Sequence, residues 1–198
     1  MNLNNELYRQ TESKSGGGST LNQTQTIIQE IPILLNTLNV TSLLDAPCGD
    51  FNWMKCVDLT GIKYTGIDIV SSVINQNNNI YANKNISFAV LDILTDNLPK
   101  SDIILCRDCL VHFTIDGVFE AVKNFKKSGS KYLLTTTFTG DRINKLTALM
   151  GHWNPYKLTA PPFNFPEPLL IINENCTEAN REYTDKSLAL WKLEDIVI

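Results

Sequence analysis

The sequence predicts an α/β fold in which helices cover a mostly parallel sheet. Short apolar segments alternate along the chain with segments whose apolar residues recur at helical spacing. Such alternation favours parallel strands joined by right-handed helical crossovers. The chain of 198 residues is long enough for one domain with a sizeable core, and its 43% hydrophobic and 19% charged residues are ordinary for a globular protein.

Five segments are predicted to form the parallel strands, at 41–45, 63–67, 86–91, 102–107 and 131–138. The last is densest in the β-branched and aromatic residues that favour strands. After Phe138 the alternation stops, because the many prolines as far as Pro166 disfavour regular structure. Two further strand candidates, 168–173 and 187–193, complete the sheet as an antiparallel hairpin.

Helices are predicted in the intervening segments. The first begins at Leu21, and Pro32 is expected to kink or divide it. Its apolar face comprises Ile27, Ile28, Ile31, Leu34, Leu35 and Leu38. A short helix should contain Trp53 and Met54, and a polar helix should cover 70–82. Thr114 is the predicted N-cap of a helix whose buried face comprises Val118, Ala121, Val122 and Phe125.

The first strand ends in an acid and a tight turn, in the run Leu43-Leu44-Asp45-Ala46-Pro47-Cys48-Gly49-Asp50. Open parallel sheets bind ligands at the carboxyl ends of their strands. A nicotinamide dinucleotide is disfavoured, because a pyrophosphate needs several glycine-exposed amides, whereas this turn has one glycine and the extra charge of Asp50. A ligand with an adenine, a ribose and a cationic amino-acid group fits better, since Asp45 favours its ammonium and Asp68, at the next strand end, suits its ribose hydroxyls. S-adenosylmethionine is such a ligand.

These residues resemble the motifs of class I S-adenosylmethionine-dependent methyltransferases along most of the chain. Asp45 to Gly49 stand at the first motif, although its usual G-x-G-x-G is reduced to Pro-Cys-Gly. Asp68 matches the acid that binds the ribose, and Asp92 matches the acid that meets the adenine amino group. Residues 101–113 resemble the motif of the fourth strand and the turn after it.

The resemblance implies a Rossmann-like three-layer sandwich with a mostly parallel seven-stranded sheet and a C-terminal antiparallel hairpin. It also implies S-adenosylmethionine as cofactor and S-adenosylhomocysteine as product. The residues expected to bind the cofactor are Asp45, Ala46, Pro47, Cys48, Gly49, Asp50, Trp53, Asp68, Ile69, Asp92, Ile93 and Arg107.

Three residues after the fourth strand are candidates for catalysis, namely Arg107, Asp108 and His112. Methyl transfer requires donor and acceptor in line and often a base that removes the acceptor's proton. An imidazole is a common general base in enzymes, which makes His112 a candidate, and Asp108 is an alternative base. Two other roles stay open: His112 as a structural residue, and Arg107 as a partner of Asp108 or of a substrate hydroxyl. The loop from 139 to 166, which contains His152 and Trp153, is expected to cover the acceptor or to seal the sheet edge.

No metal site is predicted. The spacing Cys106-x-x-Cys109-x-x-His112 invites a zinc interpretation, but strand alternation directs neighbouring side chains to opposite faces and no second Cys-x-x-Cys exists. A divalent metal on Asp108, Asp141 and Asn144 stays an open alternative that their spacing does not indicate. The odd number of five cysteines favours reduced thiols and a cytoplasmic location.

Residues 1–20 are predicted to be either a lid over the cofactor or a disordered tail, and 21–198 the methyltransferase domain. The sequence shows no signal peptide or apolar span, so no membrane partner is expected. With a net charge of −4 and no basic run, nucleic acid is not the expected partner. The expected substrate is a small polar acceptor, above all a hydroxyl of a saccharide or nucleotide-sugar. A protein or RNA substrate and a non-catalytic cofactor-binding scaffold are the alternatives, and the oligomeric state is not predicted.

Overall fold

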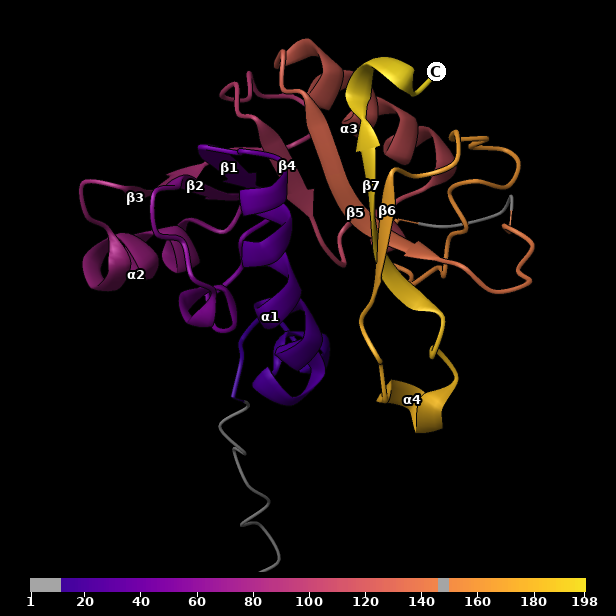
Figure 1. Ribbon diagram of the computed structural model, residues 1–198, viewed down its shortest axis with the longest axis horizontal. Helices are drawn as coiled ribbons and strands as arrows, with labels where there is room; N and C mark the ends of the chain where they lie inside the picture. The colour runs from indigo at the N-terminus through magenta and orange to yellow at the C-terminus, as the bar shows by residue number, and fades with distance from the viewer. Residues whose placement is uncertain (1–11, 146–149) are drawn as a thin grey trace, which may run out of the picture.

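The computed structural model describes residues 12–145 and 150–198, and within them one sheet has the strand order β3-β2-β1-β4-β5-β7-β6 (Figure 1). The strands are β1 (Ser42–Asp45), β2 (Lys63–Asp68), β3 (Ile86–Val90), β4 (Ile103–Cys106), β5 (Tyr132–Phe138), β6 (Leu170–Asn173) and β7 (Lys186–Lys192). Strands β1 to β5 pair in parallel, whereas β7 runs antiparallel to both β5 and β6. The predicted mostly parallel sheet with a C-terminal antiparallel pair is therefore confirmed.

Helices cover both faces of this sheet. The main ones are α1 (Leu21–Thr37), α2 (Ser71–Tyr81) and α3 (Ile115–Lys127). Alternate residues of β4 enter two separate cores: Ile103 and Leu105 pack on the side of α1 and α2, and Ile104 and Cys106 pack on the side of α3. A three-layer arrangement results, with the carboxyl ends of β1, β2 and β4 left open between the helical layers.

Two local predictions about α1 and α3 have different outcomes. The Thr114 hydroxyl caps α3 by accepting a hydrogen bond from the Gly117 amide at 3.1 Å, as predicted. Pro32, in contrast, does not divide α1, which is helical throughout. Burial of Ile27 and Ile31 before the proline, and of Leu34 and Leu35 after it, outweighs the one backbone hydrogen bond that proline removes.

Two further segments differ in length from their predictions. The predicted helix around Met54 is a single 3₁₀ turn, Met54–Cys56, with Trp53 as its N-cap residue. The link between β6 and β7 is longer than a tight hairpin, because it contains the short α4 (Glu178–Arg181). That link returns toward the open strand ends and contributes charged residues there.

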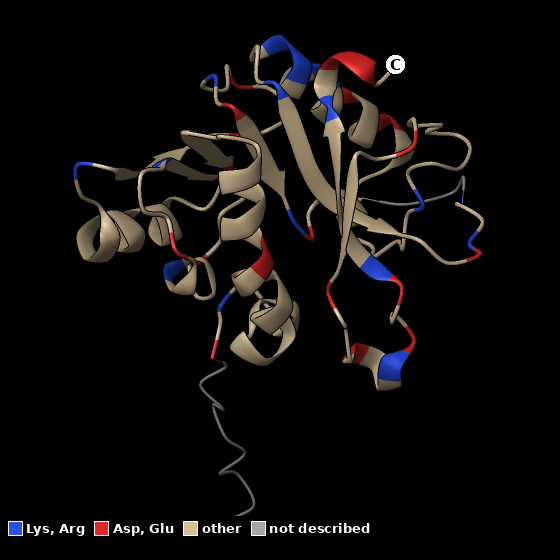
Figure 2. Cartoon of the chain, in the orientation of Figure 1, with Lys and Arg blue, Asp and Glu red and all other residues tan. Residues whose placement is uncertain are grey.

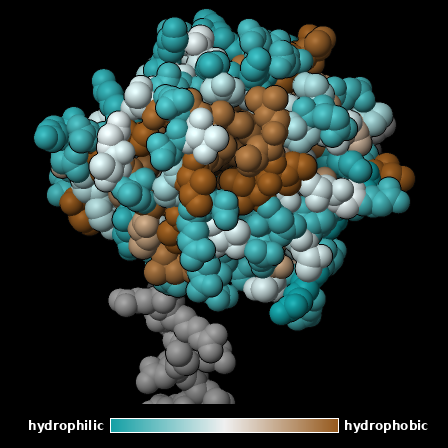
Figure 3. Space-filling model, in the orientation of Figure 1, coloured by the Kyte–Doolittle hydropathy of each residue, from teal (hydrophilic) through white to brown (hydrophobic). Residues whose placement is uncertain are grey.

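Strand β6 forms the edge of the sheet on the side of the antiparallel strands, and three of its four residues are exposed. Its Leu170 and Ile171 are exposed to solvent, as is the preceding Leu169. Figure 3 shows an apolar area at the centre of the face over β5, β7 and β6. The helical layers therefore cover this end of the sheet less completely than its centre.

Candidate active site

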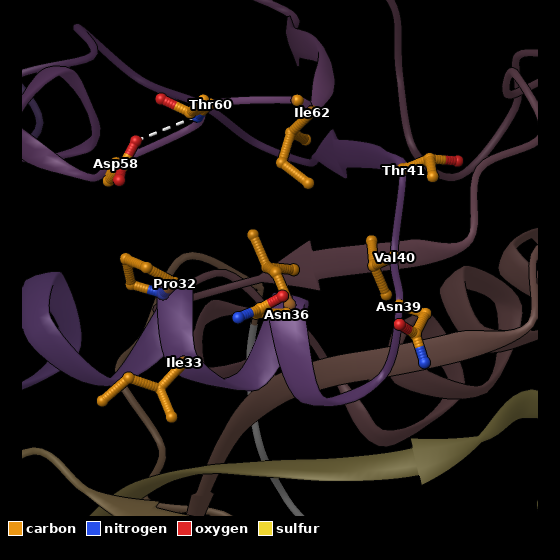
Figure 4. A pocket seen from close by; sticks show the side chains of 11 residues that line it. Pro32, Ile33, Asn36, Asn39, Val40, Thr41, Asp58, Thr60 and Ile62 are labelled. Carbon is orange, nitrogen blue, oxygen red and sulfur yellow. Dashed lines mark hydrogen bonds between the residues drawn. The ribbon is translucent and has the colours of Figure 1, made fainter.

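Two cavities lie at opposite ends of the sheet. The larger, of about 570 Å³, lies at the amino ends of β1 and β2 beside the end of α1 (Figure 4). Among the described residues that line it, Asp58 is the single titratable one, and its carboxylate accepts a hydrogen bond from the Thr60 amide at 3.0 Å. No residue predicted to bind a cofactor or to act in catalysis lines this cavity. It therefore offers no evident chemistry.

The second cavity, of about 300 Å³, lies at the carboxyl ends of β1, β2 and β4. That volume falls within the range of small-ligand sites. Most predicted site residues line it, namely Asp45, Pro47, Cys48, Gly49, Trp53, Asp68, Arg107, Asp108 and His112. Lys14, Ser15 and Ser19 of the N-terminal segment also line it, and so do Val70 and Val73, which the sequence motifs do not mark.

Other predicted residues lie outside this lining. Ala46 and Ile93 are buried in the core on the α3 side, and Ile69 is exposed. The Asp92 carboxylate accepts a hydrogen bond from the Leu94 amide at 2.8 Å, at the turn after β3. Asp50 faces the N-terminal segment.

Asp45 is a buried acid at the end of the strand β1. It is 3% exposed, and the Tyr64 hydroxyl donates to its Oδ2 at 2.7 Å. Burial raises the pKa of Asp45 from 3.8 to about 7, against the opposing effects of the Tyr64 hydrogen bond and the Arg107 charge. A ligand cation beside Asp45 would lower this pKa again. The carboxyl is thus suited to a cationic partner.

Gly49 allows the turn after β1 to approach its neighbours closely. Its φ is +53°, and a side chain there would place a Cβ 2.2 Å from the Ser15 hydroxyl. The Gly49 amide donates to one oxygen of Asp68 at 3.2 Å, and the Val70 amide donates to the other at 2.9 Å. Asp68 is therefore fixed at the end of β2 beside this turn.

The N-terminal segment 12–20 is seated on the same turn. Asp50 accepts hydrogen bonds from the hydroxyls of Ser13 (3.0 Å) and Ser15 (3.1 Å) and from the Lys14 amide (2.6 Å). The Asn52 side-chain amide donates to the Glu12 carboxylate at 2.8 Å and to the Ser19 carbonyl at 3.1 Å. Residues of this segment thus line one side of the cavity, and residues 1–11 of the predicted lid lie outside the described residues.

A cluster of buried charges closes the other side. Arg107, whose side chain is 4% exposed, binds Glu174 at 2.7 Å and donates to the Gly18 carbonyl at 2.8 Å. Its guanidinium lies 5.5 Å from the Trp53 ring centre and 3.4 Å from Asp108. The shorter of its two acid contacts is to Glu174, a residue that sequence motifs do not indicate.

Asp108 binds Lys186, the first residue of β7, at 2.5 Å. Burial would raise the pKa of Asp108, but the charges of Arg107 and Lys186 and the hydrogen bond from Lys186 hold it below its ordinary value. Lys186 and Glu174 are far from Asp108 in sequence and follow no recognisable spacing. Only the antiparallel addition of β6 and β7 brings them to the strand ends.

The remaining candidates lie around the loop after β5. His112 lines the cavity, and its carbonyl accepts a hydrogen bond from the Gly151 amide at 2.7 Å. Trp153 packs on Tyr183 with ring centres 4.2 Å apart, in a separate hollow of about 400 Å³. His152 is not part of either lining. Residues 146–149 of this loop lie outside the described residues.

Within residues 12–145 and 150–198, no three His, Cys, Asp or Glu side chains gather as a metal site. Asn144 is occupied by hydrogen bonds with the backbone of Lys157 and Pro161, and Asp141 is exposed. The five cysteines are free thiols, and Cys106 is buried in β4. In the same part of the chain, no helix has the length and apolarity needed to cross a bilayer.

No protein-family model matches the chain, and no curated protein matches its sequence. Solved structures do match its fold. The N-methyltransferase NodS from Bradyrhizobium japonicum WM9 is 16% identical with a TM-score of 0.63, over 89% of this chain and 98% of that one. The methyltransferase domain of bacterial CtHen1-CN is 11% identical with a TM-score of 0.61, over 87% and 100%.

Human N-acetylserotonin methyltransferase, in complex with S-adenosylmethionine, is 14% identical with a TM-score of 0.57, over 90% of this chain and 60% of that one. Identities of this size show similarity of fold. The chain has the Rossmann-like fold of class I S-adenosylmethionine-dependent methyltransferases.

Proposed function

We propose that this protein is an S-adenosylmethionine-dependent methyltransferase that acts on a small polar acceptor. The observation that carries the proposal is the cavity at the carboxyl ends of β1, β2 and β4. It brings the acids Asp45 and Asp68 together with Arg107, Asp108 and His112. In a fold shared with these methyltransferases, that cavity occupies the place where open parallel sheets bind ligands.

The residues present are suited to the cofactor. The buried Asp45 would bind its ammonium, since a buried carboxyl gains most from a cationic partner. Asp68 would exchange its two backbone amide contacts for the ribose hydroxyls. Gly49 exposes backbone between them, and residues 12–20 cover the bound molecule. Asp92 and Ile93 are proposed to meet the adenine when it is bound.

The cofactor supplies the methyl group as an electrophile. The protein orients the acceptor and removes its proton, and Asp108 and His112 are the proposed bases, with Arg107 beside them. Residues 21–198 form the catalytic domain in this proposal, with a cytoplasmic location and no resident metal.

The proposed acceptor is a hydroxyl of a saccharide or nucleotide-sugar. The aromatic pair of Trp153 and Tyr183 beside the strand ends supports it, because sugar rings pack on such surfaces. RNA is the less favoured alternative, since basic residues are interspersed with acids in the view of Figure 2 rather than gathered in one run. A protein substrate and a non-catalytic scaffold are tested in the same experiments.

Calorimetry with S-adenosylmethionine and S-adenosylhomocysteine tests the proposal. Both should bind the wild type, and D68A should weaken binding at least about tenfold, the value of a charge-assisted hydrogen bond. D58A is the control: Asp58 also accepts a backbone hydrogen bond but lies at the opposite end of the sheet. This variant should bind both ligands as the wild type does. Absence of binding to the wild type, with NAD protecting it instead, would show that the proposal is wrong.

Incubation with labelled S-adenosylmethionine and separate panels of nucleotide-sugars, glycans, peptides and RNA identifies the acceptor. Label transfer to a sugar hydroxyl is expected. Transfer of label to peptide or RNA would show that the proposed acceptor class is wrong and that the proposed methyl transfer is right. Binding of the cofactor without transfer to any of these acceptors would favour the non-catalytic scaffold.

A further inference from the structure

Asp108 has an unusual side-chain environment in the turn after β4. Its backbone φ is +51°, in the left-handed region that aspartate adopts more readily than most residues. Its Oδ1 atom is shielded from solvent and has no hydrogen-bond partner among the described residues, although buried carboxylate oxygens are usually paired. Both features occur at a residue that lines the candidate active site.

The described neighbours of Asp108 engage only its other oxygen, Oδ2. Oδ2 lies 2.5 Å from the Lys186 ammonium and 3.4 Å from the Arg107 guanidinium. The Asp108 amide is held by the Thr136 hydroxyl at 2.8 Å, which fixes the backbone. Asp108 is therefore held through Oδ2 and through its backbone amide, while Oδ1 makes no hydrogen bond with the described residues.

Lys186 is the second buried cation of this arrangement, beside Arg107. Its side chain is 3% exposed, and its ammonium also lies 3.6 Å from Glu174 and 3.8 Å from Glu178. Three carboxylates (Asp108, Glu174 and Glu178) thus surround two cations (Arg107 and Lys186), with His112 on the cavity side. The cluster holds one more negative charge than positive, so it favours a donor or a cation at the unused oxygen.

We propose that Lys186 is a positioning residue for methyl transfer: it holds Asp108 by Oδ2 and keeps Oδ1 free for the acceptor. This inference rests on the proposed function. The acceptor's O–H or N–H proton passes to Oδ1, and the electron pair of the acceptor atom forms the bond to the methyl carbon. The electrons of the broken carbon–sulfur bond remain on sulfur, which leaves S-adenosylhomocysteine.

Sinefungin provides a test that needs no knowledge of the acceptor, because a protonated amine replaces its methylated sulfonium. An ionised carboxylate beside the methyl position should bind that amine. The readout is the ratio of the affinities for sinefungin and S-adenosylhomocysteine, measured by calorimetry between about pH 5 and pH 8.5. We expect the wild type to prefer sinefungin about tenfold or more, the value of a charge-assisted hydrogen bond, and D108N to lose this preference.

K186M should reduce the preference and shift its loss to higher pH, because Asp108 then keeps its burial but loses one of its two cations. K186R should restore both the preference for sinefungin and its pH dependence. K192M removes a lysine from the other end of β7, where it contacts Glu194 at the surface, and should behave as wild type. The double variant K186M/E174Q removes one charge of each sign, and it provides the same readout if K186M is too unstable to purify.

Unchanged preference and pH dependence in K186M would overturn the inference and leave Lys186 a structural residue. Equal wild-type affinity for the two ligands at every pH would also overturn it while leaving the proposed function intact. Failure of the wild type to bind S-adenosylhomocysteine would overturn both.

Discussion

At the scale of single residues, the acids at the strand ends are the part of the site that sequence reasoning anticipates best. Asp45 and Asp68 end the strands β1 and β2, Asp108 lies just after β4, and parallel strands end at one edge of the sheet. Their environments are different and could not be anticipated. Asp45 is enclosed by neighbouring strands, Asp68 is held by backbone amides, and Asp108 is paired with Lys186.

The burial of Asp45 predicts an unusual dependence of stability on pH. Its pKa is about 7 in the folded protein and 3.8 ordinarily, so the folded state binds the proton more tightly. The contribution of Asp45 to the free energy of unfolding is therefore fully present below about pH 4 and is lost as pH rises to about 7. D45N should raise the free energy of unfolding by about 1–3 kcal/mol at pH 8, and by much less at pH 4.

Thermal or urea unfolding of the wild type and D45N at the two pH values measures this difference. An equal shift at pH 4 and pH 8 would contradict the assigned protonation of Asp45. The same substitution should weaken cofactor binding, since a neutral amide in place of the carboxylate would offer no charge to an ammonium. A gain in stability with a loss of binding is the expected behaviour of a functional buried acid.

At the scale of elements, the sequence pattern anticipates which segments are strands and helices, because their apolar spacing reflects burial in the layers. It fails where tertiary contacts decide. Pro32 stays within α1 because buried residues precede and follow it in the helix. Glu174 and Lys186 enter the site through the pairing of β6 with β7, and no local pattern reports that approach.

The N-terminal segment illustrates a second limit. Its serines and glycines are typical of a flexible linker, yet Ser13 to Ser15 are held by Asp50. Composition alone gives no sign of the partner carboxylate, because the contacts span more than thirty positions in the chain.

D50A should release this segment. The variant loses the acceptor for the Ser13, Lys14 and Ser15 contacts, and trypsin should then cleave after Lys14 several-fold faster than in the wild type, since cleavage follows the open population. D58A, with the same change of charge elsewhere on the surface, serves as control. Equal cleavage of D50A and wild type would show that Asp50 does not hold the segment, and slower cleavage with S-adenosylhomocysteine present would support its role as a lid.

At the scale of the whole molecule, the central strand β4 couples the two faces of the sheet. Leu105 packs into the core beneath α1 and α2, and Ile104 packs into the core beneath α3, and neither is exposed. Both cores therefore share one hydrogen-bonded strand, and loss of either should release the other. The site depends on this coupling, since Asp45 on β1 and Arg107 after β4 are held by adjacent strands.

We expect L105A and I104A each to lower the free energy of unfolding by about 2–5 kcal/mol, as for other large-to-small changes in packed cores. Each variant should still unfold in one transition, because the two cores cannot separate without breaking β4 from its neighbours. Far-UV circular dichroism is to be compared with tryptophan fluorescence in two backgrounds: W53F/W153F leaves Trp191 in the core on the α3 side, and W153F/W191F leaves Trp53 in the core on the side of α1 and α2. Coincident midpoints would establish one cooperative domain, whereas separate midpoints for the two faces would show that the layers fold independently and that the site can be lost while half of the sheet remains.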